Sequence, residues 1–238
     1  MRGSMLKAGA RRLMVENAPK IFFVSVVYLI ISTLMSELEY RLPGTDAAYV
    51  MYLNNVLEGV IPSFDLFFSF LRPSGIALAF VLILLHPVLE VGYLRYCLNI
   101  SRSQGGGYKD IFDGFLFFGK IILIRIITSV LIFLWSMLLI IPGIVASYRY
   151  RQAYYILFDA PEKGALQCIR ESKQLMDGNK IDLLVLDLSF FGWFILDFFV
   201  VLLLPIPFSL PLLSIWLMPY LWTTRAMYYD FIIKRIVV

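Results

Sequence analysis

Long apolar stretches, separated by short polar segments, dominate the pattern along this chain of 238 residues. Several of them approach or exceed the ~20 apolar residues that a helix needs to cross a bilayer. Helices are the element that such runs predict, because a helix satisfies its backbone hydrogen bonds within itself. We expect spans near residues 21–38, 74–97, 116–140, 144–158, 181–204 and 212–233. The predicted fold is all-α: a polytopic transmembrane helix bundle of about six spans.

The fourth span is the least regular of the set. Pro142-Gly143 breaks the helix after the third span, and only about 15 apolar residues follow before Asp159. At 1.5 Å per residue they cover ~22 Å, which is less than the ~30 Å hydrocarbon core. If the chain did not return to the cytoplasm after Pro142, the basic residues from Arg149 to Lys180 would lie on the external side. That placement contradicts the tendency of Lys and Arg to stay on the cytoplasmic side. We predict either a short fourth span or the second arm of a re-entrant hairpin.

The polar segments indicate which side each loop occupies. Residues 1–20 are basic and are predicted to be cytoplasmic, and their first four residues resemble an expression-tag remnant. The region 39–73 holds more acidic than basic residues and is predicted to be external. Residues 21–238 then form a single transmembrane domain with both chain termini in the cytoplasm.

Residues 159–178 predict a cytoplasmic amphipathic helix. Asp159-x-x-Glu162 has the spacing of a capping box, and Gly178 suits a C-terminal stop. Apolar residues such as Ile169 fall on one side of this helix, with charged residues on the other. It is either an elbow that covers the ends of the spans or a site for a partner or a lipid headgroup.

Composition supports the membrane class and narrows the chemistry. The chain is 60% hydrophobic and only 16% charged, with a mean hydropathy of +0.80. Its net charge of +4 is explained by basic loops, and no aromatic-and-basic pattern predicts a nucleic-acid partner. Cys97 and Cys168 are expected to be free thiols, and no cysteine or histidine cluster predicts a metal site or a cofactor.

Four sequence stretches from Leu134 onward occur in a characteristic order. They are LWSMLLIIPGIVASYRY, ILFDAPEKGALQCIRESKQLMDGNK, LDLSFFGWFIL and MPYLWTTRAMYYDFI. Together they resemble the bacterial integral membrane family known as domain of unknown function 975. The resemblance covers nearly the whole chain and is strongest from Asp110 to the end. It implies a multi-pass protein of the bacterial plasma membrane, and it supplies no catalytic residues.

Charged residues inside the predicted spans reach similar depths. Counted at 1.5 Å per residue from the cytoplasmic end of each span, they lie ~9 to 13 Å deep. The members of this layer are Glu90, Arg125, Arg149, Arg151, Asp187 and Arg225, with His86 one turn from Glu90 on the same helix face. Charges within a membrane are costly, so they are paired or functional.

Two interpretations of this layer remain open. In the first, the acids neutralise the arginines and fix the helix register. In the second, the layer lines a cytoplasm-facing cavity for an anionic lipid, peptide or small molecule. We predict that Asp187 pairs with Arg225 or with an arginine of the fourth segment. Arg149 and Arg151 are ~200° apart on a helix, so they cannot both face one cavity.

Three classes of function follow. The first is a non-enzymatic protein that binds an anionic ligand in the polar layer, with or without transporting it. The second is a structural or accessory protein that acts through a protein partner or as a homo-oligomer, in secretion, assembly or self-protection against peptides. The third, an intramembrane enzyme, is disfavoured because no HExxH motif is present and the single histidine, His86, has no obvious catalytic partner. No catalytic residue is predicted.

Overall fold

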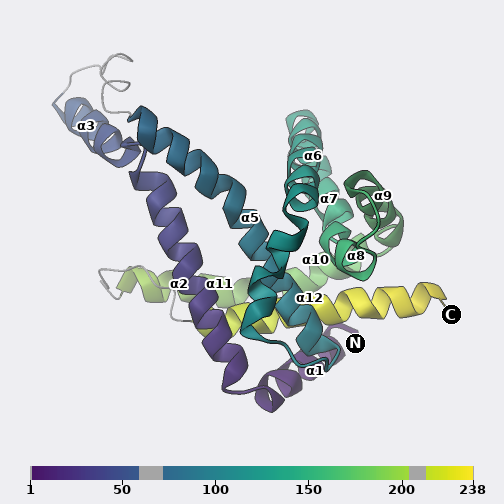
Figure 1. Cartoon of the computed structure of the whole chain (residues 1–238). Helices are drawn as coiled ribbons and strands as arrows, with labels where there is room; N and C mark the ends of the chain where they lie inside the picture. The colour runs from purple at the N-terminus through teal and green to yellow at the C-terminus, as the bar shows by residue number, and fades with distance from the viewer. Residues whose placement is uncertain (1, 59–71, 204–212, 238) are drawn as a thin grey trace. The chain divides into compact units, whose positions relative to one another are not determined.

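The computed structural model describes residues 2–58, 72–203 and 213–237, and every regular element among them is a helix (Figure 1). The α-helices are α1 (Arg2–Glu16), α2 (Lys20–Arg41), α3 (Thr45–Leu57), α5 (Pro73–Ser101), α6 (Phe118–Leu138), α7 (Ile140–Tyr150), α8 (Ala153–Asp159), α9 (Ala165–Leu175), α10 (Lys180–Leu188), α11 (Phe191–Leu203) and α12 (Ser214–Val237). A 3₁₀ segment, η1 (Tyr108–Phe117), leads into α6. The all-α prediction is confirmed for these residues. Residues 59–71 of the expected external region, and the junction between the last two expected spans, lie outside them.

Among the residues that the structure describes, four helical stretches are long and apolar enough to cross a membrane, which indicates a membrane protein. They are Lys20–Arg41, Pro73–Ser101, Tyr108–Leu138 and Lys180–Val200, at the places of the expected first, second, third and fifth spans. The expected fourth span is divided into α7 and α8 by a turn at Arg151 and Gln152. Helix α12 is not among the four, and it carries both acidic and basic residues.

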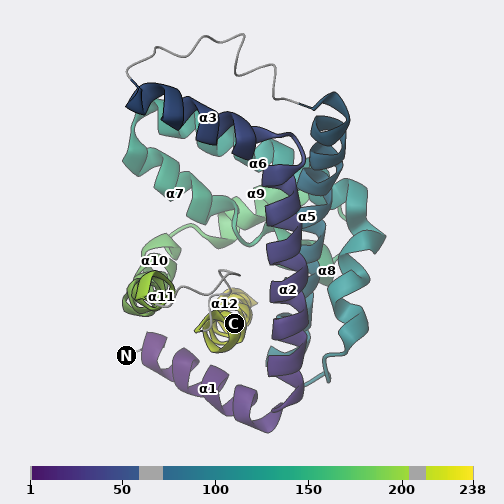
Figure 2. The same cartoon turned by 90° about the vertical axis from the view of Figure 1, so that its left-hand side faces the viewer.

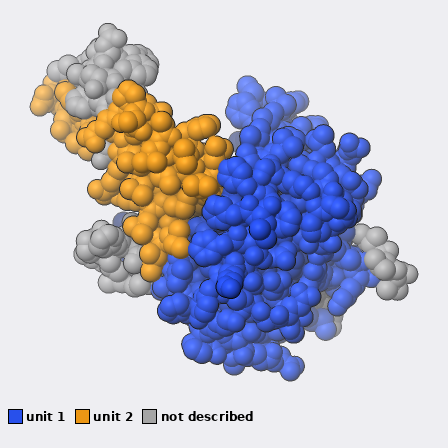
Figure 3. Space-filling view, viewed as in Figure 1, with its two compact units in different colours: residues 1–28, 88–238 blue, residues 29–87 orange. Residues whose placement is uncertain are grey.

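The chain forms two compact units, which are coloured separately in Figure 3. Unit 1 comprises residues 1–28 and 88–238, and unit 2 comprises residues 29–87. Helices α2 and α5 each contribute residues to both units. The charged layer predicted from the sequence falls in unit 1, with the exception of His86.

Helices α6 and α7 form a tight hairpin because only Leu139 separates them. Its backbone is extended, with φ −163° and ψ 150°. Pro142 is tolerated in the first turn of α7, where a backbone N–H has no helical partner. Gly143 packs directly against Ser136, and a Cβ at this position would overlap the serine side chain. The proline and glycine therefore set the turn and the close approach of the two helices.

The core of unit 1 lies where α5, α6, α8, α9 and α12 meet. Its fully buried members include Val88, Ile124, Leu157, Cys168 and Tyr229. Figures 1 and 2 show α11 and α12 running alongside each other, across the direction of the α6–α7 hairpin. The helices of unit 1 therefore do not all run parallel, and side chains from several directions converge on its interior.

The amphipathic helix is shorter than predicted, and the predicted capping box is wrong. Helix α9 begins at Ala165 rather than after Asp159, and its N-cap residue is Gly164, without a side-chain cap. Asp159 instead ends α8, and its carboxylate binds Arg102. The local spacing fits a helix cap, but the Asp159 carboxylate forms an ion pair with Arg102, which lies 57 residues earlier in the sequence.

Candidate functional site

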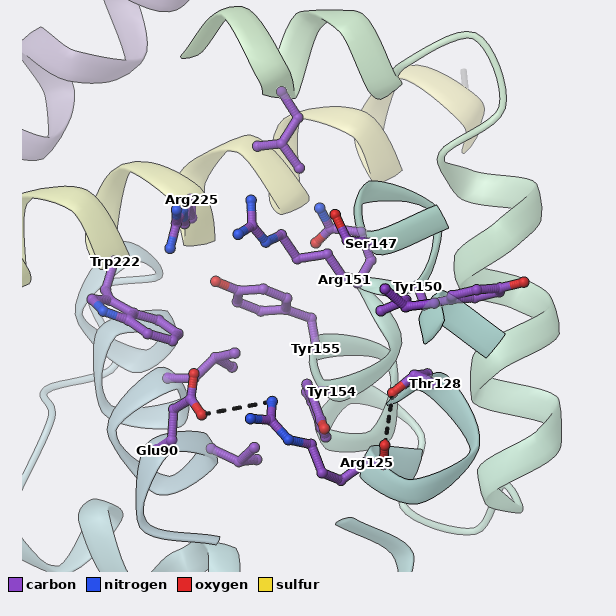
Figure 4. Close-up of a pocket in the computed structure, with 15 residues that line it drawn as sticks. Glu90, Arg125, Thr128, Ser147, Tyr150, Arg151, Tyr154, Tyr155, Trp222 and Arg225 are labelled. Atoms are coloured by element: carbon purple, nitrogen blue, oxygen red, sulfur yellow. Dashed lines mark hydrogen bonds and ion pairs between the residues drawn. The ribbon is translucent and has the colours of Figure 1, made fainter. Parts of the chain in front are cut away.

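A cavity of about 220 Å³ lies inside unit 1, between α5, α6, the α7–α8 turn and α12 (Figure 4). Its charged lining consists of Glu90 of α5, Arg125 of α6, Arg151 of the α7–α8 turn, and Arg225 of α12. The aromatic lining consists of Tyr150, Tyr154, Tyr155 and Trp222. In the view of Figure 4, Tyr155 lies between the Glu90–Arg125 pair and the other two arginines. The cavity thus combines cationic groups with apolar ring faces.

Asp187 of α10 holds two of these arginines in place. Its carboxylate accepts a hydrogen bond from the Arg225 guanidinium at 3.0 Å and binds Arg151 through the other oxygen. The hydroxyl of Tyr148 donates to the same carboxylate at 3.0 Å. The Asp187 side chain is only 11% exposed. Its charge is therefore well compensated, as a buried carboxylate requires.

Arg125 is held less tightly than the other two arginines. Its Nη1 lies 4.0 Å from the Glu90 carboxylate, and its side chain is 53% exposed. A direct charge-assisted hydrogen bond would be closer to 2.8 Å, so this is a loose ion pair. The site then holds three guanidinium groups and two carboxylates, a net formal charge of +1, and Arg125 is the arginine whose carboxylate partner lies farthest away.

The predicted pairing of Asp187 is confirmed, and both proposed partners bind it together. The structure also brings Glu90, Arg125, Arg151 and Arg225 around one cavity.

Arg149 does not line the cavity, as its angular separation from Arg151 predicts. Its carbonyl accepts a hydrogen bond from Ser172 of α9 at 2.9 Å. Its buried Nε has no hydrogen-bond partner among the described residues. Arg149 therefore lies outside the cavity lining, and it serves as a natural control for the arginines of the cavity.

His86, the remaining predicted site residue, belongs to a separate cluster in unit 2. Its Nδ1 lies 3.2 Å from a Glu39 carboxylate oxygen, and its Nε2 lies 3.1 Å from the Ser32 hydroxyl. Sequence reasoning found no partner for this histidine, because both partners lie on α2, more than 40 positions earlier. Glu39 lies within α2, although the sequence prediction placed it at the start of the external region.

The order of these groups, hydroxyl, imidazole and carboxylate, is that of a hydrolase triad. Ser32, however, lies in the interior of α2, where backbone N–H groups donate to carbonyls one turn earlier. Such a position leaves no free pair of backbone donors beside the hydroxyl to stabilise an oxyanion. The cluster therefore joins α2 to α5 by hydrogen bonds between polar side chains.

Sequence reasoning missed a second charged centre around Arg102. Its guanidinium binds the carboxylate of Asp159 at 2.6 and 3.0 Å, and that of Asp230 in α12 at 2.6 Å. The Tyr229 hydroxyl donates to Asp159 at 2.8 Å. These carboxylates raise the pKa of Arg102, with Asp159 the larger influence. Only the position of Arg102 just after α5 was visible in sequence, and nothing local indicated its partners.

Metal chemistry gains no support from the described part of the chain. No group of three or more histidine, cysteine or acidic side chains is placed there to hold an ion. Cys97 and Cys168 are free, as the sequence predicted, and both are buried.

Comparison with known proteins identifies one family. Residues 136–236 match the family described as "Protein of unknown function (DUF975)". The matched segment contains Arg149, Arg151, Asp187 and Arg225, but not Glu90 or Arg125. No curated protein and no solved structure matches the chain.

Proposed function

We propose that this chain, whose residues 136–236 match the DUF975 family, binds an anionic amphiphile in the cavity of unit 1. The observation that carries the proposal is Arg125, which lines the cavity with its nearest carboxylate, that of Glu90, 4.0 Å away. A guanidinium with only a loose ion pair to a carboxylate is suited to a phosphate or carboxylate ligand, which it can bind through two parallel hydrogen bonds.

The remaining lining supports an amphiphile rather than a small inorganic anion alone. Tyr154, Tyr155 and Trp222 offer ring faces beside the charged groups. Aromatic side chains pack well against apolar groups and tolerate a polar neighbour. The candidate spans keep the chain in a membrane, where anionic lipids supply phosphate and acyl chains in one molecule.

A protein of the bacterial plasma membrane with both termini in the cytoplasm is the setting that we propose. The basic residues after α5 and around α9 support this orientation, because Lys and Arg favour the cytoplasmic side. We further propose that the protein acts by binding, without catalysing a reaction. Transport across the membrane is a further step that this proposal does not include.

The test is native mass spectrometry of the protein released from nanodiscs, comparing the wild type with Arg125→Gln and Arg149→Gln. Both substitutions remove one positive charge, but only the first removes it from the cavity. We expect a defined anionic lipid or metabolite on the wild type and on Arg149→Gln, and its loss from Arg125→Gln. Melting temperatures of the three proteins would show that each is folded.

A bare protein in all three samples would contradict the proposal. It would assign the arginines to helix packing and turn attention to the accessory function. The exposed face of α9, with Leu166, Arg170 and Lys173, would then be the first surface to test for a protein partner.

A further inference from the structure

The turn between α6 and α7 presents a continuous aliphatic surface, which we call the hairpin tip, Met137–Ile141. Its five residues are Met137, Leu138, Leu139, Ile140 and Ile141, and each is between 67% and 77% exposed. No charged residue occurs between Arg125 and Arg149. A turn that emerged into water would normally carry polar residues, because exposed aliphatic side chains are unfavourable there.

The lengths of the two arms limit how far the tip can reach. Lys120 donates hydrogen bonds to the carbonyls of Pro161 and Lys163, so its ammonium lies at the level of that polar loop. From Lys120 to Leu138, α6 rises ~27 Å at 1.5 Å per residue. The other arm, from Ile140 to Arg149, rises only ~14 Å before its first charge.

These lengths compare with a hydrocarbon core of ~30 Å and a bilayer of ~40 to 45 Å including the headgroups. Even a straight, upright α6 would end short of the far headgroups. At the tip, the N–H of Leu139 donates to the carbonyl of Trp135 at 3.3 Å, that of Gly143 donates to the carbonyl of Leu139 at 3.4 Å, and Pro142 has no N–H. These features reduce the number of backbone donors that the turn would leave unsatisfied in hydrocarbon.

We infer that the hairpin tip ends among the acyl chains of the bilayer and does not emerge on the far side. Its partner is lipid hydrocarbon, because the tip directly continues the candidate span Tyr108–Leu138. The segment from α6 to α8 then has both of its ends on one side of the membrane, and it contributes no loop to the far side. This inference concerns a surface of α6 and α7 outside the cavity and is independent of anion binding.

The experiment uses the full chain in liposomes, with cysteine introduced at the tip as Leu139→Cys. Gln174→Cys, at an exposed position of α9, is the water-facing control. The wild type reports the background from Cys97 and Cys168, which are both fully buried. A membrane-impermeant maleimide is presented from each side of the bilayer in turn. We expect Q174C to react from one side and L139C to react from neither.

A second readout separates lipid from protein as the cover of the tip. L139C is labelled with the fluorophore NBD in detergent and then reconstituted with lipids that carry a nitroxide in the headgroup or in the acyl chain. Acyl-chain nitroxides should quench the label more strongly than headgroup nitroxides. Reaction of L139C with the impermeant maleimide from either side would overturn the inference. So would a disulfide-linked L139C dimer with no quenching by lipid, because that result would assign the tip to contact between two copies.

Discussion

Replacing Asp187 by asparagine removes the charge that holds two arginines at the wall of the cavity. Removing one partner of a buried ion pair typically costs about 3 to 5 kcal/mol, because the other charge is left uncompensated. Arg225 is 18% exposed, so its pair with Asp187 belongs near the lower end of that range. Arg151 is 36% exposed, and solvent reduces its share to about 0 to 1 kcal/mol. An asparagine can still accept the hydrogen bond from Tyr148, so we expect a total loss of about 3 kcal/mol.

The assay is thermal unfolding in one detergent, followed by tryptophan fluorescence, with Asp177→Asn as the matched control. Asp177 also pairs with a cation, Lys180, but its side chain is 80% exposed. An exposed pair contributes little to stability, because solvent screens its charges. At about 2 to 4 °C per kcal/mol for a chain of this size, Asp187→Asn should lower the melting temperature by about 6 to 12 °C. The control should shift it far less, because its ion pair is screened by solvent.

Equal melting temperatures for the two variants would refute this reasoning. They would mean that Asp187 is solvated in the membrane protein and that Arg225 does not depend on it. A double-mutant cycle with Arg225→Gln would then show no coupling between the two residues, whereas the structure predicts that their effects are not additive.

Three further predictions follow from other charged groups. Glu90→Gln should strengthen retention of an anionic ligand, because it removes the negative charge 4.0 Å from Arg125. Native mass spectrometry would measure the change, and weaker retention would count against a binding role for Arg125. Arg102→Lys should lower the melting temperature although it keeps the charge, because an ammonium cannot satisfy two carboxylates in a fork; an unchanged melting temperature would contradict this. The hydrogen bond from Lys163 lowers the pKa of Glu171, so its small stabilisation is present above the unfolded pKa and is lost as pH falls through the folded pKa. Glu171→Gln should remove that part of the acid dependence of the melting temperature, and an identical pH profile would argue against the pair.

Periodicity and depth counting predicted those features that depend on one helix at a time. The candidate spans follow from apolar length, and the break after α6 follows from Pro142-Gly143. The opposite directions of Arg149 and Arg151 follow from the helical rotation of 100° per residue. The pairing of Asp187 was also predictable, because a buried carboxylate at the depth of several arginines needs a cation.

Features that depend on distant parts of the chain were not predictable. Asp159 has the local signature of a helix cap, yet it binds Arg102, which also binds Asp230 at the far end of the chain. His86 was placed beside Glu90 because the two share a helix face, but its hydrogen bonds go to Ser32 and Glu39 of unit 2. One sequence contains the periodicity of each helix but not the side chains that neighbouring helices bring to it.

The measurement that tests the anion site most directly is an equilibrium titration with a soluble, short-chain anionic phospholipid. It compares the wild type, Arg125→Gln and Arg149→Gln in the same detergent and at the same salt concentration. A charge-assisted hydrogen bond contributes about 1.5 to 3 kcal/mol, which corresponds to an affinity change of about 10- to 150-fold. We predict a loss of that size for Arg125→Gln, with Arg149→Gln close to the wild type. Equal affinity in all three proteins, or the larger loss in Arg149→Gln, would contradict the assignment of the cavity as the binding site.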